Sequence, residues 1–226
     1  MNTPARYDGS AQWYDERFRH YGDLTEVDSS ASLLATVLGR GDGWCLDVGC
    51  GTGLHAAAIE STGRRVFGVD LSADQLAHAA HRIAVRVRTD ATRLPFRDGT
   101  FPSAVCTYVH TDIEQIGQVF AEVCRVMRHG GTFVYVGVHP CFWGPHIERV
   151  DETTRVVHPG YWECSWRTRS PYWSDVGLAS RVGFRHRTLA DLLTELLSSG
   201  LRLTHVAEGA RGAPFADRIA IAAVKE

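Results

Sequence analysis

The chain has 226 residues, of which 44% are hydrophobic and 22% charged, and its formal net charge is −2. This length and composition predict a soluble globular chain of one domain. The small net charge argues against a nucleic-acid partner, because such partners need a surplus of Lys and Arg. The longest apolar run, Ile219–Val224, is too short to cross a membrane, and the polar N-terminus does not resemble a signal peptide. We therefore expect a cytoplasmic protein with no membrane partner.

The cysteines give no indication of a metal centre. None of the six cysteines pairs with another at CxxC spacing, which is typical of zinc sites. Without a secretion signal, cysteines are normally reduced. We expect free thiols and no bound metal.

The hydrophobic pattern alternates between strand and helix periods along the chain. Strands are predicted at 44–48, 65–69, 83–88, 101–108, 132–138, 201–208 and 219–224. Helices are predicted at 7–20, 29–38, 54–61, 73–82, 112–127 and 189–197. This alternation predicts an α/β fold, a mostly parallel sheet with helices on both faces, and a closing antiparallel pair around a turn at 209–214. Ligands of such sheets bind beyond the carboxyl ends of the strands.

Residues 139–187 interrupt this alternation. They contain Trp143, Trp162, Trp166 and Trp173, four of the six tryptophans. Long loops inside a domain are usually functional or disordered, and the aromatic content argues against disorder. We expect a lid whose aromatic side chains enclose a small apolar or aromatic molecule. The alternative, which is compatible with a lid, is that these aromatics form the core of a small helical cap.

A glycine-rich loop follows the first predicted strand. The segment LDVGCGTG, Leu46 to Gly53, places Asp47 at the strand end and Gly49 and Gly51 in the turn before a helix. Glycine permits a sharp turn and a close approach of a ligand to the backbone. A dinucleotide fingerprint needs its third glycine at position 54, where this chain has leucine. The sequence therefore argues against a nicotinamide-dependent oxidoreductase.

Acidic residues follow the next two strands. Asp70 ends the second strand, where a carboxylate can accept hydrogen bonds from both hydroxyls of a ribose. The alternative is that Asp70 caps the helix that starts at Ala73, although Ser72 is the better cap. Asp90 follows the third strand, where it can meet an adenine amino group or simply be a polar loop residue.

Together these motifs resemble class I S-adenosylmethionine-dependent methyltransferases of the small-molecule, Methyltransferase-11-like type. The resemblance covers residues 42–138 well and the last strands loosely. It implies a Rossmann-like fold with a seven-stranded sheet, S-adenosylmethionine as cofactor and S-adenosylhomocysteine as product. Related enzymes often have Phe-Asp where this chain has Phe101-Pro102, and a proline suits the start of a strand.

The resemblance also implies roles for individual residues. Gly49 and Gly51 would pack against the methionine part of the cofactor and Asp47 would lie near its amino group. Leu71 would cover one face of the adenine. The tyrosines Tyr7 and Tyr14 resemble those that cover the cofactor carboxylate in related enzymes, although they also suit the apolar face of a helix. The full implied set is Tyr14, Asp47, Gly49, Gly51, Asp70, Leu71, Asp90, Ala91 and Tyr108.

Methyl transfer needs an aligned acceptor and sometimes a base. Histidine is the usual base near neutral pH, and His110 and His139 follow the fourth and fifth strands, whose ends face the methyl group in this fold. We take these two as candidate catalytic residues. The alternative is that both are packing residues and that no base is needed.

We expect one domain over residues 1–226, with a helical cap (1–41), a cofactor-binding core (42–138), the lid (139–187) and a final helix and strands (188–226).

The leading hypothesis is methyl transfer to an O, N or C atom of a small, preferably aromatic metabolite, in natural product biosynthesis. A second is a non-methylating cyclisation, elimination or decarboxylation on the same scaffold. A third is a binding module without turnover. The substrate is a small molecule in each enzyme hypothesis, and the chain is a monomer or homodimer.

Overall fold

The computed structural model describes residues 5–26, 29–174, 176–209 and 214–226. The helices are α1 (Ala11–Phe18), α2 (Ser30–Leu38), α3 (Ala56–Ser61), α4 (Ala73–His78), α5 (Ile116–Val126), α6 (Leu178–Val182) and α7 (Leu189–Ser198), with 3₁₀ turns η1 (Arg19–Gly22), η2 (Ala79–His81) and η3 (Val109–Thr111). The strands are β1 (Trp44–Val48), β2 (Arg65–Asp70), β3 (Val85–Arg88), β4 (Phe101–Thr107), β5 (Met127–Val138), β6 (Ile147–Arg149), β7 (Arg155–Val157), β8 (Trp166–Arg167), β9 (Phe184–Arg185), β10 (Leu201–Glu208) and β11 (Arg218–Lys225).

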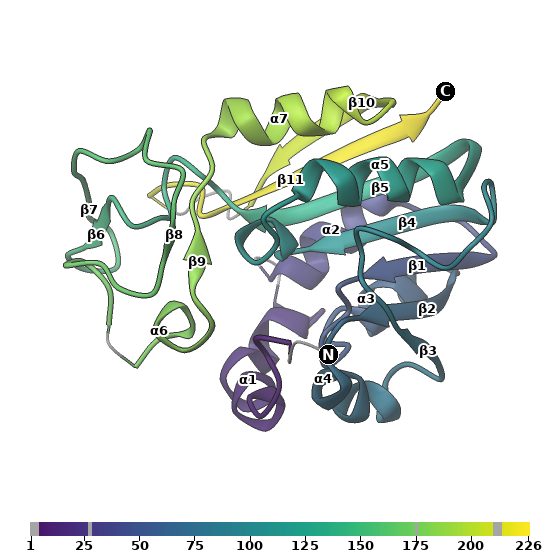
Figure 1. Ribbon diagram of the computed structural model, residues 1–226, viewed down its shortest axis with the longest axis horizontal. Helices are drawn as coiled ribbons and strands as arrows, with labels where there is room; N and C mark the ends of the chain where they lie inside the picture. The colour runs from purple at the N-terminus through teal and green to yellow at the C-terminus, as the bar shows by residue number, and fades with distance from the viewer. Residues whose placement is uncertain (1–4, 27–28, 175, 210–213) are drawn as a thin grey trace.

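Seven strands form one sheet in the order β10-β11-β5-β4-β1-β2-β3 (Figure 1). Strands β5, β4, β1, β2 and β3 are parallel, whereas β11 runs antiparallel to both β5 and β10. The predicted mostly parallel sheet and its closing antiparallel pair are confirmed. Most of the turn predicted at 209–214 lies outside the described residues.

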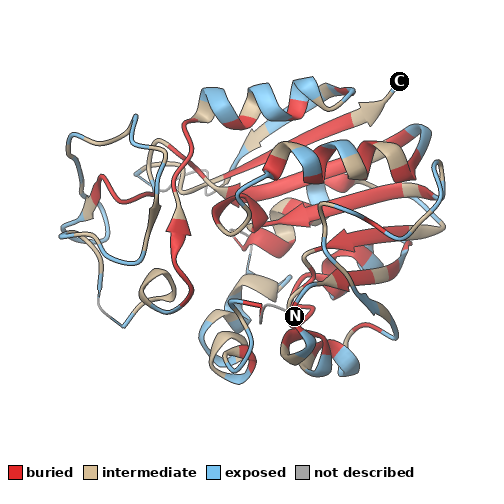
Figure 2. Cartoon of the chain, in the orientation of Figure 1, coloured by how far each residue is buried: buried red, intermediate tan, exposed pale blue. Residues whose placement is uncertain are grey.

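Helices cover both faces of this sheet, as predicted. Helices α5 and α7 pack on one face, and α2, α3 and α4 on the other (Figure 1). Along β1, Leu46 and Val48 pack into the core beneath α5 and α7, whereas Cys45 packs into the core beneath α2, α3 and α4. This follows from the alternation of side chains along a strand. The central strands are buried on both faces (Figure 2), which explains their nearly continuous apolar sequences.

Several predicted boundaries shift. The helices predicted to begin at 54 and 112 begin at Ala56 and Ile116, because turns after β1 and β4 occupy the residues before them. Strand β5 begins at Met127 rather than 132, because Met127 pairs with Phe101 of β4. Gly130 still bends the backbone at φ +72°, but within the strand. The ladder shifts register between Phe101 and Ser103, which is where Pro102 lacks a donor.

The insertion 139–187 forms two short antiparallel pairs, β6-β7 and β8-β9, and one helix, α6. It lies beyond the carboxyl ends of the central strands, beside α1 (Figure 1). The alternative of a helical cap is wrong, since only α6 is helical among the described residues of the insertion. The aromatic residues of the insertion differ in their surroundings. Trp173 donates a hydrogen bond to Gly144 O at 3.2 Å, whereas Trp162 is 80% exposed.

Candidate functional site

The glycine loop after β1 turns in the left-handed region of backbone space. Gly49 has φ +72° and Gly51 has φ +53°. A Cβ on Gly49 would lie 2.9 Å from a methyl carbon of Val109, so a larger residue would be strained there and would also clash. The amides of Gly49 and Cys50 both donate to Val69 O, at 2.8 and 3.0 Å, which holds the loop against the end of β2.

Asp70, at the end of β2, organises this loop. Its Oδ2 accepts from the Gly51 amide at 2.9 Å, and its Oδ1 accepts from the Ser72 amide at 2.8 Å. Burial raises the pKa of Asp70, and these backbone bonds oppose the rise. Ser72 Oγ accepts from the Gln75 amide at 3.2 Å, so Ser72 caps α4 as predicted. The Asp70 carboxylate is therefore left to face the loop.

Asp47 ends β1 with a buried carboxylate. Its side chain is 1% exposed, and Oδ1 has no hydrogen-bond partner among the described residues. Burial and the neighbouring charge of Asp70 raise the pKa of Asp47 to about 7. A buried carboxylate without a partner is costly, so the site needs a cation or a proton.

The predicted adenine edge is more open. Leu71 is 48% exposed, and Asp90 is also exposed. Asp90 Oδ1 accepts from the amide and the hydroxyl of Thr92, at 2.8 and 2.7 Å, closing a turn after β3. Ala91 is partly buried beside it. The turn places Asp90 and Ala91 at the carboxyl edge of the sheet.

The N-terminal segment covers the site with tyrosines. The rings of Tyr7 and Tyr14 meet edge to face at 5.8 Å. The Tyr7 hydroxyl hydrogen-bonds Asp112, and burial, first, and then the charge of Asp112 raise the pKa of Tyr7. Burial raises the pKa of Asp112 to about 7. Tyr14 stands among Asp112, Tyr108 and Asp70, and its pKa is also raised by burial.

Three carboxylates, the buried Asp47 and the partly buried Asp70 and Asp112, thus share one enclosure, and each has a raised pKa. Their mutual repulsion and the unpartnered Asp47 oxygen suit a positively charged ligand. The left-handed glycines leave the backbone open to a close approach. A sulfonium with an α-amino group meets these requirements, so the residues fit S-adenosylmethionine.

His110 lies in a buried network on the α5 side of the sheet. Its Nδ1 shares a hydrogen bond with the Tyr135 hydroxyl, and its carbonyl accepts from Arg187. Burial, and then the charge of Arg187, lower the pKa of His110 to about 3. The ring is therefore neutral at physiological pH.

His139, directly after β5, has both ring nitrogens engaged. Nδ1 accepts from the Cys141 amide at 3.2 Å, which leaves Nε2 to donate to Glu208 Oε1 at 3.0 Å. Burial lowers the pKa of His139, and the Glu208 carboxylate opposes this. His139 lies at the substrate end of the sheet, paired with an acid from β10.

Two arginine–tryptophan contacts join the N-terminal cap to the insertion. The Arg6 guanidinium lies 3.6 Å above the ring of Trp166 in β8. Conversely, Arg181 of α6 lies 4.3 Å from the ring of Trp13 in α1. Arg6 also donates to Asp112 O at 3.2 Å, which links these contacts to the carboxylate enclosure.

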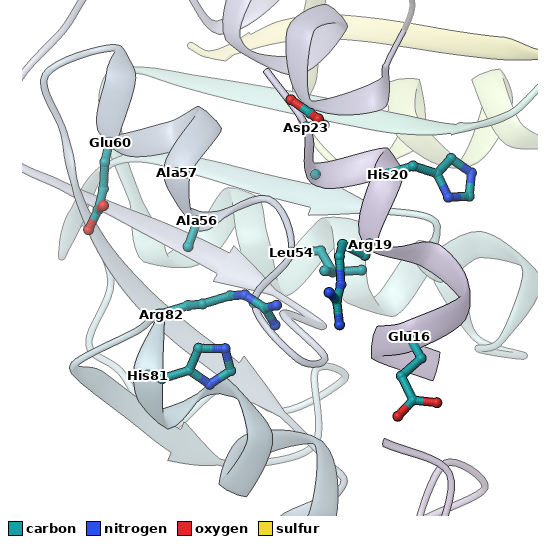
Figure 3. A pocket seen from close by; sticks show the side chains of 12 residues that line it. Glu16, Arg19, His20, Asp23, Leu54, Ala56, Ala57, Glu60, His81 and Arg82 are labelled. Carbon is teal, nitrogen blue, oxygen red and sulfur yellow. The ribbon is translucent and has the colours of Figure 1, made fainter. Parts of the chain in front are cut away.

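A cavity of about 690 Å³ lies between η1 and the start of α3 (Figure 3). Its lining includes Gly53 and Leu54 of the glycine loop, but none of Asp47, Asp70 or Tyr108. Seven further lining residues are charged or polar, Glu16, Arg19, His20, Asp23, Glu60, His81 and Arg82, and Gly22, Ala56 and Ala57 complete the lining. None of the residues predicted to bind the cofactor lines this cavity.

The sequence reading missed Asp112, His55 and Arg218 as neighbours of the site. Asp112 is the last residue of the segment AVCTYVHTD (104–112), and its position shortly after β4 is visible in the sequence. His55 follows the glycine loop, where nothing in its spacing marks it. Arg218 begins an antiparallel strand, so its position beside the carboxyl end of β5 depends on tertiary pairing.

Residues 46–135 match the family model described as a methyltransferase domain. A demethylmenaquinone methyltransferase from Mycolicibacterium gilvum is 34% identical over 89 residues, which are 39% of this chain and 39% of that protein. The chain matches 39% to 57% of the length of this and two further mycobacterial relatives with the same name.

Solved structures match over nearly the whole chain. An S-adenosylmethionine-dependent methyltransferase from Mesorhizobium loti has a TM-score of 0.70 at 24% identity, covering 86% of this chain and 96% of that one. The 4+2 cyclase SpnF has a TM-score of 0.64 at 17% identity, covering 100% of this chain and 97% of that one. These likenesses confirm the predicted fold class. Among the described residues, no helix is long and apolar enough to cross a membrane, and no metal-ligand cluster is present.

Proposed function

We propose that this protein transfers a methyl group from S-adenosylmethionine to an O, N or C atom of a small molecule, because residues 46–135 match a methyltransferase domain model and the chain has the fold of S-adenosylmethionine-dependent methyltransferases. The observation that carries the proposal is the enclosure of Asp47, Asp70 and Asp112, which favours a cationic cofactor. The cofactor supplies an electrophilic methyl group on sulfur. The chain must hold it and align the acceptor.

The predicted cofactor residues other than the two glycines each have a place in this proposal. Asp70 would accept from the ribose hydroxyls while it holds the glycine loop. Asp47 would face the amino group. Leu71, Asp90 and Ala91 would border the adenine at the open edge, and Tyr14 and Tyr108 would close the site near sulfur.

An aromatic substrate is supported by the insertion, which contributes tryptophan and tyrosine rings beyond the strand ends. The relatives named demethylmenaquinone methyltransferase point to the same class of acceptor. We also propose a role in natural product biosynthesis and a cytoplasmic protein without a nucleic-acid partner. The likeness to SpnF supports the alternative of a non-methylating cyclisation on this scaffold.

Incubation with methyl-labelled S-adenosylmethionine and a small-molecule extract of the source organism tests the proposal. Label in a new small product together with S-adenosylhomocysteine is the expected result. An altered metabolite without S-adenosylhomocysteine would support the non-methylating alternative instead. Cofactor binding without any altered metabolite would support a binding module.

Where the acceptor must lose a proton, we propose His139 as the base in preference to His110. Glu208 supports a positive charge on His139, whereas burial and Arg187 oppose one on His110. We expect His139→Gln to lower kcat about 100-fold at neutral pH and to remove the acid limb of the kcat profile. Rate profiles of His139→Gln and Glu208→Gln measure this. An unchanged profile in His139→Gln would exclude the role.

We propose that the insertion is a lid held to the cap by its arginine–tryptophan contacts. Such a contact stabilises by about 0.5–2 kcal/mol. We expect Trp166→Ala to speed hydrogen exchange in 139–187 and α1 by a few-fold to about tenfold, and substrate to slow it in the native chain. Trp162→Ala is the matched control, since Trp162 is 80% exposed. Equal exchange in the two variants, or with and without substrate, would contradict the lid.

A further inference from the structure

Tyr108 and Arg218 come from different strands but meet at one edge of the sheet. Tyr108 directly follows β4, and Arg218 begins β11 opposite Val138, the last residue of β5. Because β4 and β5 are parallel, their carboxyl ends lie together there. This is the edge at which open α/β sheets bind their ligands.

Arg218 is a partly buried cation beside aromatic rings. Its side chain is 14% exposed, and its guanidinium lies 5.2 Å from the centroid of the Tyr21 ring. The Tyr108 hydroxyl lies close to it but has no hydrogen-bond partner among the described residues, and Asp217 Oδ2 lies 3.5 Å from Nη2. Arginine keeps its charge in such an environment. The pair therefore presents a positive charge and a hydroxyl next to each other.

The backbone and a polar network fix the direction of Tyr108. Its φ of +61° is the only left-handed value among the described residues other than glycine. Such strain is typical of functional positions. Its ring stacks on Tyr21 at 6.0 Å, and Ser30 lies beside its hydroxyl. Ser30 Oγ in turn lies 2.9 Å from Nε2 of His55.

We propose that Arg218 and Tyr108 bind an oxyanion on a conjugated ring of the substrate, a phenolate or an enolate, and so select ionised acceptors. This inference rests on the proposed function and names its substrate class. The Tyr108 hydroxyl donates a hydrogen bond to the oxyanion, and Arg218 supplies the opposite charge. A neutral phenol can accept the hydrogen bond but lacks the attraction to the charge of Arg218, so binding favours the ionised form.

Ionisation makes the acceptor nucleophilic. The hydroxyl proton of the acceptor leaves to His139 or to water. The acceptor oxygen, or a carbon conjugated with it, then forms a bond to the methyl carbon as the methyl–sulfur bond breaks and its electron pair stays on sulfur. A carbon acceptor finally loses its ring proton to solvent.

The charged and titratable groups that face the pair determine the expected pH response. They are Tyr14, Tyr21, His55, Tyr135 and Asp217. Burial, first, and then Arg218 lower the pKa of His55 to about 4, so its ring is neutral above pH 5. The Asp217 carboxylate opposes an oxyanion, and Arg218 favours one. Tyr108 stays protonated because burial raises its pKa to about 12.

The test uses 4-nitrophenol as probe, in the presence of S-adenosylhomocysteine, with phenolate absorbance followed against pH. We expect the pKa of the bound probe to lie about one to three units below its value in solution, the range for an adjacent opposite charge. Arg218→Met and Tyr108→Phe should reduce the shift, and Arg218→Lys should restore part of it. Arg202→Met is the matched control, an arginine 58% exposed on β10.

An unshifted probe in the native chain, a shift that persists in both variants, or no binding of the probe would overturn the inference. Melting curves establish that each variant folds, and Tyr108→Phe keeps the ring if Arg218→Met does not fold. The methyl-label assay is independent of this readout. A shifted probe without methyl transfer would therefore reject the proposed function and retain the oxyanion site.

Discussion

Asp70→Ala is expected to weaken S-adenosylmethionine binding at least about 100-fold, since each hydrogen bond to a charged group contributes about 1.5–3 kcal/mol. The substitution removes the proposed ribose acceptor. It also removes the partner of the Gly51 and Ser72 amides, which hold the glycine loop in place. Calorimetry with S-adenosylmethionine and with S-adenosylhomocysteine measures the loss. A melting curve establishes that the variant still folds.

Ser72→Ala is the matched control for this substitution. Ser72 caps α4 and donates to Asp8 Oδ1 at 2.6 Å, so its loss should lower the free energy of unfolding by about 1 kcal/mol. Its hydroxyl has no part in the proposed ribose contact, and we expect cofactor affinity within about threefold of native. An unchanged affinity of Asp70→Ala for S-adenosylmethionine would contradict the assignment of Asp70 to the ribose. Equal losses of cofactor affinity in Asp70→Ala and Ser72→Ala would show that Asp70 has a structural role only.

The directions of the sheet strands were predictable from local patterns, whereas their order in the sheet was not predicted. Short apolar runs separated by helical periods indicate parallel strands, and a glycine loop after the first strand identifies its carboxyl end. Boundaries were less predictable. Met127 joins β5 because Phe101, far away in sequence, pairs with it. The hydrophobic pattern of either segment alone does not contain that pairing.

The candidate site shows the same division. Asp47, Gly49, Gly51 and Asp70 belong to two motifs whose spacing is local, and the structure brings them together. Arg218 joins Tyr108 only because β11 enters the sheet antiparallel beside β5. The raised pKa values of the three carboxylates likewise follow from burial, which no sequence motif encodes. The contacts between Arg6 and Trp166 and between Arg181 and Trp13 depend on how the insertion folds back on the cap.

Cofactor affinity is expected to rise at least about tenfold between pH 6 and pH 8, through linkage to the proton on Asp47. Burial and Asp70 raise the pKa of Asp47 to about 7 in the free chain, and a bound cation favours the ionised form. Binding below pH 7 must therefore displace a proton. Asp112, whose pKa is also raised to about 7, adds to the dependence. Calorimetry in buffers of different ionisation enthalpy measures the protons released.

Asp47→Asn separates binding from stability. The folded pKa of Asp47 lies above its unfolded value, so the stability it contributes is present at low pH and is lost as pH rises through about 7. Asparagine resembles the protonated form. The free variant should therefore melt at a higher temperature than the native chain at pH 8, yet bind S-adenosylmethionine more weakly and with a smaller pH dependence. Asp98→Asn is the control, because Asp98 is an exposed partner of Arg125. If Asp47→Asn melts lower than native at pH 8, or keeps the full pH dependence of binding, Asp47 does not carry the charge that the cofactor neutralises.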